Sequence, residues 1–118
     1  MALKNLTATD FTEVTDGDGI VLVDFWATWC GPCVRFAPVY ERVSEKHPDI
    51  VFAKVDTEAE LELSEAFGIR AIPTIAAIRD GVIVFQQAGA LPEQALESLI
   101  TQVRDLDMDE VRGRAKAA

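Results

Sequence analysis

The sequence has little cysteine, little histidine and few basic residues, and it has no long apolar run. Its 11 basic residues stand against 20 acidic ones, which gives a net charge of −9. This charge argues against nucleic acids and anionic membranes as partners, because phosphates need cationic counterparts. No stretch approaches the roughly 20 apolar residues of a membrane span, and the N-terminus carries no export cleavage pattern. We therefore expect a protein of the cytoplasm.

Two further absences bear on cofactors and on domain organisation. The chain has no glycine-rich phosphate-binding fingerprint, so we expect it to bind neither a flavin nor a nicotinamide cofactor itself. It also has no internal repeat, linker or low-complexity block, and 118 residues, 49% of them hydrophobic, fit one folded domain. We place this domain at residues 1–106. Residues 107–118 are mostly charged or small, which predicts a short polar tail, either a frayed helix or a loose end.

The pattern of apolar residues predicts strands that alternate with helices. Strands are predicted at residues 20–27, 50–55, 74–78 and 82–87, with a hairpin turn at Asp80-Gly81 between the last two. Helices are predicted at residues 9–15, capped by Thr9, at 33–46, at 57–67, opened by a Thr57/Glu60 capping box, and from Pro92 onward. The first strand is apolar on both faces, as in a sheet covered on both sides. This order predicts an α/β protein with a central mixed sheet flanked by helices on both faces.

The only two cysteines lie two residues apart in Trp29-Cys30-Gly31-Pro32-Cys33, where the first apolar strand leads into a helix. Residues three apart on a first helical turn have Cα atoms roughly 5 to 6 Å apart, which suits a disulfide. A bridge that closes so short a loop stabilises the fold by only about 2 kcal/mol in the chain-entropy estimate. The pair is therefore better suited to reversible thiol–disulfide exchange than to stabilising the fold. A helix N-terminus favours the thiolate that attacks disulfides. Cys30 lies nearest that terminus, and we expect the more buried Cys33 to displace what Cys30 captures.

Two other interpretations of the cysteine pair stay open from the residues alone. The cysteines could be buried neighbours without chemistry, although Gly31 and Pro32 between them and Trp29 before them argue against this. They could also bind a metal, but a structural zinc site needs four ligands and the only histidine, His47, lies far along the chain. We therefore expect no metal site. Gly31 allows a tight entry to the helix and Pro32 fixes φ, which should influence the redox poise of the pair.

Asp24 is the second candidate functional residue, because it lies in the middle of the doubly buried strand. A carboxylate there is costly unless it is paired or neutral, and burial should raise its pKa. Six residues before Cys30, it is expected beneath the start of the helix, where it can exchange a proton with Cys33. Lys54 occupies a matching position in the next strand and could pair with Asp24. The alternatives are a silent structural aspartate and a solvated lysine.

Residues 26–33, Trp-Ala-Thr-Trp-Cys-Gly-Pro-Cys, make the chain resemble the thioredoxin family. The resemblance covers roughly residues 3–106 and includes Asp24-Phe25-Trp26, Lys54-Val55-Asp56, residues 68–74 and Gly89-Ala90-Leu91. It implies the thioredoxin fold and a reversible dithiol–disulfide oxidoreductase, an electron carrier in cell redox homeostasis that reduces protein disulfides.

The resemblance also implies roles for single residues. Cys30 would be the exposed nucleophile, Cys33 the resolving thiol and Asp24 the proton acceptor for Cys33. Gly31, Pro32 and Lys54 would tune the redox site. Pro73 would follow a cis peptide bond beside the disulfide, where the backbone of Ile72 pairs with an extended substrate. An apolar docking rim would comprise Trp29, Ile72, Gly89 and Ala90, with ordinary core packing as the alternative for Trp29.

The partners implied by the resemblance are a flavoprotein thioredoxin reductase, which would supply electrons from NADPH, and client proteins with disulfides. The clients of the family include ribonucleotide reductase, peroxiredoxins and methionine sulfoxide reductases. An oxidant or isomerase of the same fold is an alternative enzyme, and a non-catalytic binding subunit is an alternative of another class. We expect a monomer, because no heptad pattern or exposed apolar stripe is evident.

The sequence departs from the family pattern at two places. Val34 follows the second cysteine where many members carry a lysine, which removes a positive charge near the site. Ala76-Ala77 is smaller than the apolar pair often found in that strand, so the core must be filled from elsewhere.

Overall fold

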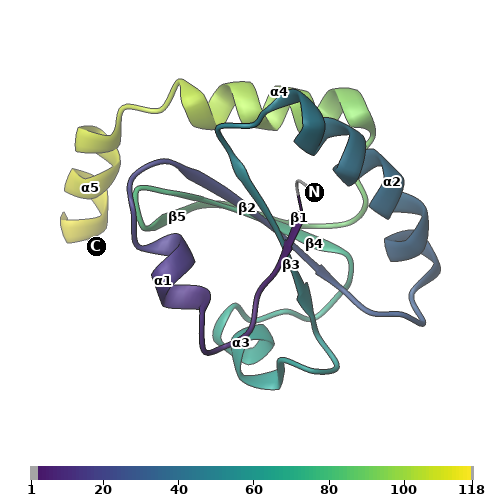
Figure 1. Ribbon diagram of the computed structural model, residues 1–118. Helices are drawn as coiled ribbons and strands as arrows, with labels where there is room; N and C mark the ends of the chain where they lie inside the picture. The colour runs from purple at the N-terminus through teal and green to yellow at the C-terminus, as the bar shows by residue number, and fades with distance from the viewer. Residues whose placement is uncertain (1–2, 118) are drawn as a thin grey trace.

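A five-stranded mixed sheet forms the centre of the protein (Figure 1). The computed structural model describes residues 3–117, and the side chains of residues 3–113. The strands are β1 (Leu3–Asn5), β2 (Ile20–Trp26), β3 (Val51–Asp56), β4 (Thr74–Arg79) and β5 (Val82–Ala88), in the order β1-β3-β2-β4-β5. β2 pairs in parallel with β3 and antiparallel with β4, and it therefore lies at the middle of the sheet. The predicted α/β class is confirmed.

Helices cover both faces of the sheet (Figure 1). They are α1 (Phe11–Thr15), α2 (Gly31–Lys46), α3 (Leu61–Ala66), α4 (Glu93–Arg104) and α5 (Met108–Ala117). Successive side chains of β2 alternate between two cores, because strand residues point to opposite faces in turn. Leu22 packs with the residues of α2 and α4, whereas Val23 packs with the residues on the side of α1 and α3. This double covering explains why β2 is apolar on both faces.

Several elements predicted from the sequence are confirmed. β2 and α2 have nearly the predicted bounds, and Pro38 lies inside α2. Asp80 and Gly81 have φ of 52° and 81°, as the tight turn of a hairpin requires, and Gly68 has φ 65° just after α3. β1 was not predicted, since its three residues show no alternating pattern and it is defined by parallel pairing with β3.

The two predicted N-terminal caps were wrong. Thr57 does not open α3, because its Oγ1 donates a hydrogen bond to the carbonyl of Trp26 at 3.0 Å. The helix begins at Leu61, and the carboxylate of Glu60 instead accepts from the backbone N–H of Ala8 at 2.9 Å. Thr9 likewise caps nothing, since α1 begins at Phe11 after Asp10. For α3, contacts outside the helix occupy the groups that local spacing had assigned to a cap.

The tail forms α5, a helix rather than a loose end. Met108 at its start is buried, and Arg112 forms an ion pair with Asp80 of the β4–β5 turn at 3.4 Å. The guanidinium of Arg79 donates to the carbonyls that end α4 and lead into α5, those of Val103, Arg104 and Leu106. Within the described part of the chain, no helix has the length and apolar character needed to span a bilayer.

Candidate active site

Cys30 and Cys33 form a disulfide at the start of α2, with their Cα atoms 5.2 Å apart. Cys30 is the N-cap residue and has extended backbone angles, while Cys33 lies in the first turn. The backbone N–H of Cys33 donates to Sγ of Cys30 at 3.2 Å. This donor and the partial positive charge of the helix N-terminus both favour negative charge on the Cys30 sulfur once the pair is reduced.

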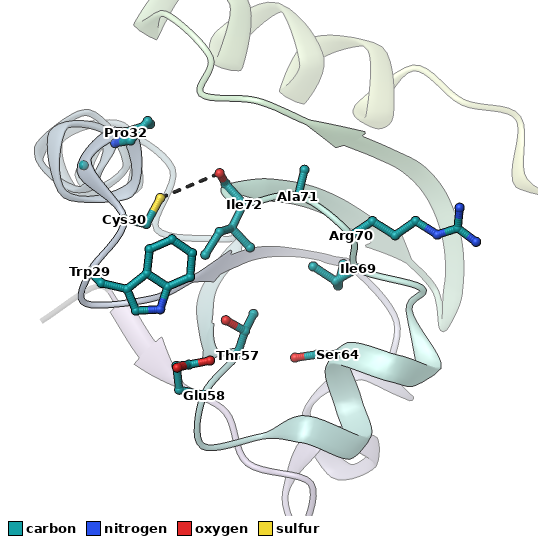
Figure 2. Close-up of a pocket in the computed structure, with 11 residues that line it drawn as sticks. Trp29, Cys30, Pro32, Thr57, Glu58, Ser64, Ile69, Arg70, Ala71 and Ile72 are labelled. Carbon is teal, nitrogen blue, oxygen red and sulfur yellow. Dashed lines mark hydrogen bonds between the residues drawn. The ribbon is translucent and has the colours of Figure 1, made fainter.

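The two cysteines differ in what they face rather than in their exposure. Cys30 is 3% exposed and Cys33 is 2% exposed, so the expected difference in burial is very small in the disulfide state. Only Cys30 lines an open hollow of about 550 Å³ beside the disulfide (Figure 2). A substrate that enters this hollow therefore meets the Cys30 sulfur.

The hollow combines segments that are far apart in the sequence. Its wall consists of residues 29–32, Thr57 and Glu58 after β3, Ser64 of α3, and residues 69–72. Trp29 is 69% exposed and stands at one side of the hollow, which rules out core packing for this side chain (Figure 2). Trp26, by contrast, is partly buried, and its indole nitrogen has no hydrogen-bond partner.

The segment before β4 forms the wall of the hollow opposite the start of α2. The Ile72–Pro73 peptide bond is cis, as the resemblance implied. The carbonyl oxygen of Ile72 lies 3.6 Å from Sγ of Cys30 (Figure 2). The N–H of Gly89 donates to the carbonyl of Pro73 at 2.7 Å. Ala90 and Pro32 both line a second and smaller hollow of about 240 Å³.

Asp24 is fully buried, and neither of its carboxylate oxygens has a hydrogen-bond partner in the structure. Burial raises the pKa of Asp24 to about 7, against the opposing effect of the Lys54 ammonium. Asp24 shares the face of β2 with Leu22, the face that α2 covers. The pKa of Tyr40, a buried residue of α2, is raised by burial and further by the charge of Asp24. The carboxylate thus lies beneath the helix that carries Cys33.

Lys54 lies opposite Asp24 in the register of β2 and β3, as the matching of the two strands predicted. It forms no ion pair with Asp24 in the structure, and its ammonium lies 4.6 Å from the ring centroid of Trp26. A cation over an indole face is electrostatically favourable. Its effect on Asp24 is therefore a field effect on the pKa rather than a hydrogen bond.

Sequence reasoning did not assign Thr57, Glu58, Ser64 or Arg70 to the site. Of these four residues, only Arg70 could have been assigned to the site from the sequence, because it lies in the segment that precedes Pro73. Thr57 is held at the hollow by hydrogen bonds from its N–H and its Oγ1 to the carbonyl of Trp26. These contacts join segments that are not adjacent in the sequence, which is why spacing alone did not reveal them.

The residues described by the structure include no cluster of three or more histidine, cysteine, aspartate or glutamate side chains suited to a metal ion. His47, at the far end of α2, contacts Glu97 at 2.6 Å and Arg104 at 3.0 Å. The histidine and the cysteines are therefore not brought together.

Comparison with known proteins agrees with this geometry. The sequence model of the thioredoxin family matches residues 2–102. "Putative thioredoxin 2" of Streptomyces coelicolor is 57% identical over 107 residues, 91% of this chain and 80% of that protein. The thioredoxin of Bacillus subtilis is 36% identical over 86% of this chain and 98% of its own. The solved structure of a mutant thioredoxin from Halobacterium salinarum matches with a TM-score of 0.82 and 35% identity, over 89% of this chain and 93% of that one. The chain belongs to the thioredoxin family, and its Cys30–Cys33 pair makes it a thiol–disulfide oxidoreductase that reduces protein disulfides.

Proposed function

We propose that this protein is a cytoplasmic electron carrier that takes electrons from NADPH through a flavoprotein thioredoxin reductase and passes them to client disulfides. The observation that carries this proposal is the position of the redox pair: Cys30 caps α2 at the edge of an open hollow, with an exposed tryptophan beside it. A client segment can reach the sulfur there without unfolding of the carrier.

Cys30 performs the first step. Its thiolate attacks one sulfur of the client disulfide, a new sulfur–sulfur bond forms to Cys30, and the other client sulfur leaves as a thiolate. The N–H of Cys33, which already donates to Sγ of Cys30, supports the anion that attacks. Because the thiolate is the nucleophile, this hydrogen bond and the helix terminus raise the reactive fraction at neutral pH.

Cys33 and Asp24 perform the second step. The thiol of Cys33 loses its proton to the carboxylate of Asp24 and attacks Sγ of Cys30, which releases the second client sulfur as a thiolate. The client gains two electrons and the carrier returns to its disulfide. A carboxyl with a pKa of about 7 suits this role, because it accepts a proton readily and releases it again near neutral pH.

The remaining site residues position the client and tune the pair. The backbone of Ile72 pairs with an extended client segment in this proposal, which is supported by the cis bond to Pro73 and by the 3.6 Å between the carbonyl oxygen of Ile72 and Sγ of Cys30. Trp29, Gly89 and Ala90 complete the rim. Gly31 and Pro32 set the geometry between the cysteines, and Lys54 adjusts the pKa of Asp24 through its charge.

Disulfide-containing proteins and a reductase are the partners that the family implies, and we propose the specific ones as ribonucleotide reductase, peroxiredoxins and methionine sulfoxide reductases. The protein would act as a monomer and hold no cofactor, since the flavin and NADPH belong to the reductase. An oxidant or isomerase role is the alternative within the same chemistry, and its mark would be a more oxidising potential.

A coupled assay tests this proposal. Purified protein, a flavoprotein thioredoxin reductase and NADPH are mixed with a test protein disulfide, and NADPH oxidation is followed by its absorbance. We expect catalytic turnover that requires all components. A protein that is not reduced by any such reductase, yet oxidises dithiols readily, would support the oxidant alternative and contradict the proposed direction.

A further inference from the structure

Arg35 and Arg70 differ from every other arginine whose side chain the structure describes. Arg42, Arg104 and Arg112 form ion pairs with Glu93, Asp49 and Asp80. Arg79 donates to backbone carbonyls at the end of α4. Arg35 and Arg70, by contrast, have neither an ion pair nor a hydrogen bond in the structure, and both are exposed. Their charges are therefore not neutralised by the protein itself.

Both unpaired arginines lie beside the redox disulfide. Arg70 lines the larger hollow with Trp29 and Cys30, and its side chain extends outward on the side away from them (Figure 2). Arg35 follows Cys33 on α2 and lines the second hollow with Pro32 and Ala90. A β-carbon on Gly31 would stand 3.2 Å from Nη1 of Arg35, so the guanidinium lies directly over Gly31. Each cation thus lines one of the two hollows that share Pro32, which lies between the two cysteines.

The residues that line the two hollows carry a net charge opposite in sign to that of the whole chain. The chain has a net charge of −9. Of the residues that line the two hollows, Arg35 and Arg70 are positive and only Glu58 is negative. Because charges beyond about 10 Å are largely screened at 0.1 M salt, a client bound in these hollows is affected mainly by the charges that line them. Exposed, unpaired charges at the edge of a binding surface favour partners of complementary charge and raise their association rates.

We propose that Arg35 and Arg70 are specificity-determining residues that select clients whose disulfide is flanked by acidic residues. The selection rests on the proposed attack by Cys30, since it concerns which disulfides are presented to that sulfur. Val34, exposed beside Cys33 and uncharged, contributes no cation of its own. The preference therefore depends on the two arginines and not on a lysine at that position.

Peptide disulfides that differ only in their flanking residues test the selection. Each peptide carries the same disulfide between Glu, Gln or Lys flanks, and the pre-reduced protein is mixed with it in 0.1 M salt. The second-order rate constant of peptide reduction is measured from the released thiols. Since exposed ion pairs contribute modestly, we expect the Glu peptide to react about five- to tenfold faster than the Lys peptide. This ratio should approach one in 1 M salt, where the screening length is about 3 Å.

A matched pair of double variants separates the effect of Arg35 and Arg70 from the effect of the total charge of the protein. R35Q/R70Q should bring the ratio between the Glu and Lys peptides to about one or below. R42Q/R112Q loses the same charge from arginines that lie away from the hollows, and it should keep the ratio of the wild type. The proposed selection would be overturned if both double variants lost the preference for the Glu peptide equally. It would also be overturned if the wild type reduced the Glu and Lys peptides at the same rate. Failure of the wild type to reduce even the Gln peptide would instead contradict the proposed reductase function on which it rests.

Discussion

We expect Cys30→Ser to abolish reduction of a protein disulfide, and Cys33→Ser to stop after one step and accumulate a mixed disulfide between Cys30 and the client. The reason is the division of the two steps between the two sulfurs, because only Cys30 lines the hollow. Turnover with NADPH and a thioredoxin reductase measures the first result. Mass spectrometry of non-reduced samples measures the second, as an adduct that a dithiol reverses.

Loss of stability does not account for these effects. A disulfide that closes so short a loop contributes about 2 kcal/mol in the chain-entropy estimate, and both variants lose the same bond. The matched control is therefore the reduced wild-type protein, whose thermal unfolding should resemble that of either variant. An adduct trapped by Cys33 in the Cys30→Ser protein, with none in Cys33→Ser, would reverse the assigned roles and contradict the mechanism.

Asp24→Asn should make the folded protein more stable than the wild type at neutral pH and have little effect near pH 4. The folded pKa of about 7 lies above the ordinary value of 3.8. Between these values the folded protein keeps a proton that the unfolded chain releases, so raising the pH favours unfolding. A separation of about 3 pH units corresponds to about 4 kcal/mol, lost by the wild type as the pH rises from about 4 to 7. Denaturant unfolding of both proteins across this range measures the difference.

The comparison of wild type and variant is needed because other carboxylates change stability in the opposite direction. The pKa of Asp49 is lowered to about 2 by its hydrogen bond with Arg104. The stability that such a carboxylate contributes to the folded protein is lost as the pH falls. Their contribution is the same in both proteins and cancels in the difference. A difference that does not change between pH 4 and 8 would show that Asp24 does not keep its proton in the folded state.

The same variant should slow the second step of exchange. Without a proton acceptor, attack by Cys33 should be about 100-fold slower at neutral pH, the lower range of general base catalysis. In the wild type this step should also slow as the pH falls below about 7, because Asp24 becomes protonated. Release of the second client thiol from a pre-formed mixed disulfide measures it. If Asp24→Asn resolves the mixed disulfide as fast as the wild type across neutral pH, Asp24 is not the acceptor.

The centre of this fold could be predicted from the sequence because its signals are local. An apolar run identifies β2, helical spacing identifies α2, and the Asp80-Gly81 pair identifies the hairpin. The cysteines and Asp24 could be found as well, since their chemistry is unusual for their positions. The position of Lys54 opposite Asp24 followed from two apolar strands of similar pattern.

The features that were not predicted depend on contacts between distant segments. Thr57 resembles a cap by spacing, but its hydroxyl binds the carbonyl of Trp26, 31 residues away. Lys54 contacts the Trp26 ring rather than the carboxylate opposite it. The lack of partners for Arg35 and Arg70 is a property of the whole described surface, which no local pattern contains. Tertiary contacts therefore decide the details of the site, whereas local chemistry identifies its reactive groups.

In the reduced protein, the sulfur of Cys30 should be a thiolate stabilised by the N-terminus of α2 and by the N–H of Cys33. The direct measurement is the rate of alkylation of the reduced protein as a function of pH, with the modified cysteine identified by mass spectrometry. We predict that Cys30 reacts first and that its rate rises with a midpoint below the value of about 8.5 for a free thiol. A midpoint at or above that of free cysteine, or preferential reaction of Cys33, would contradict the account.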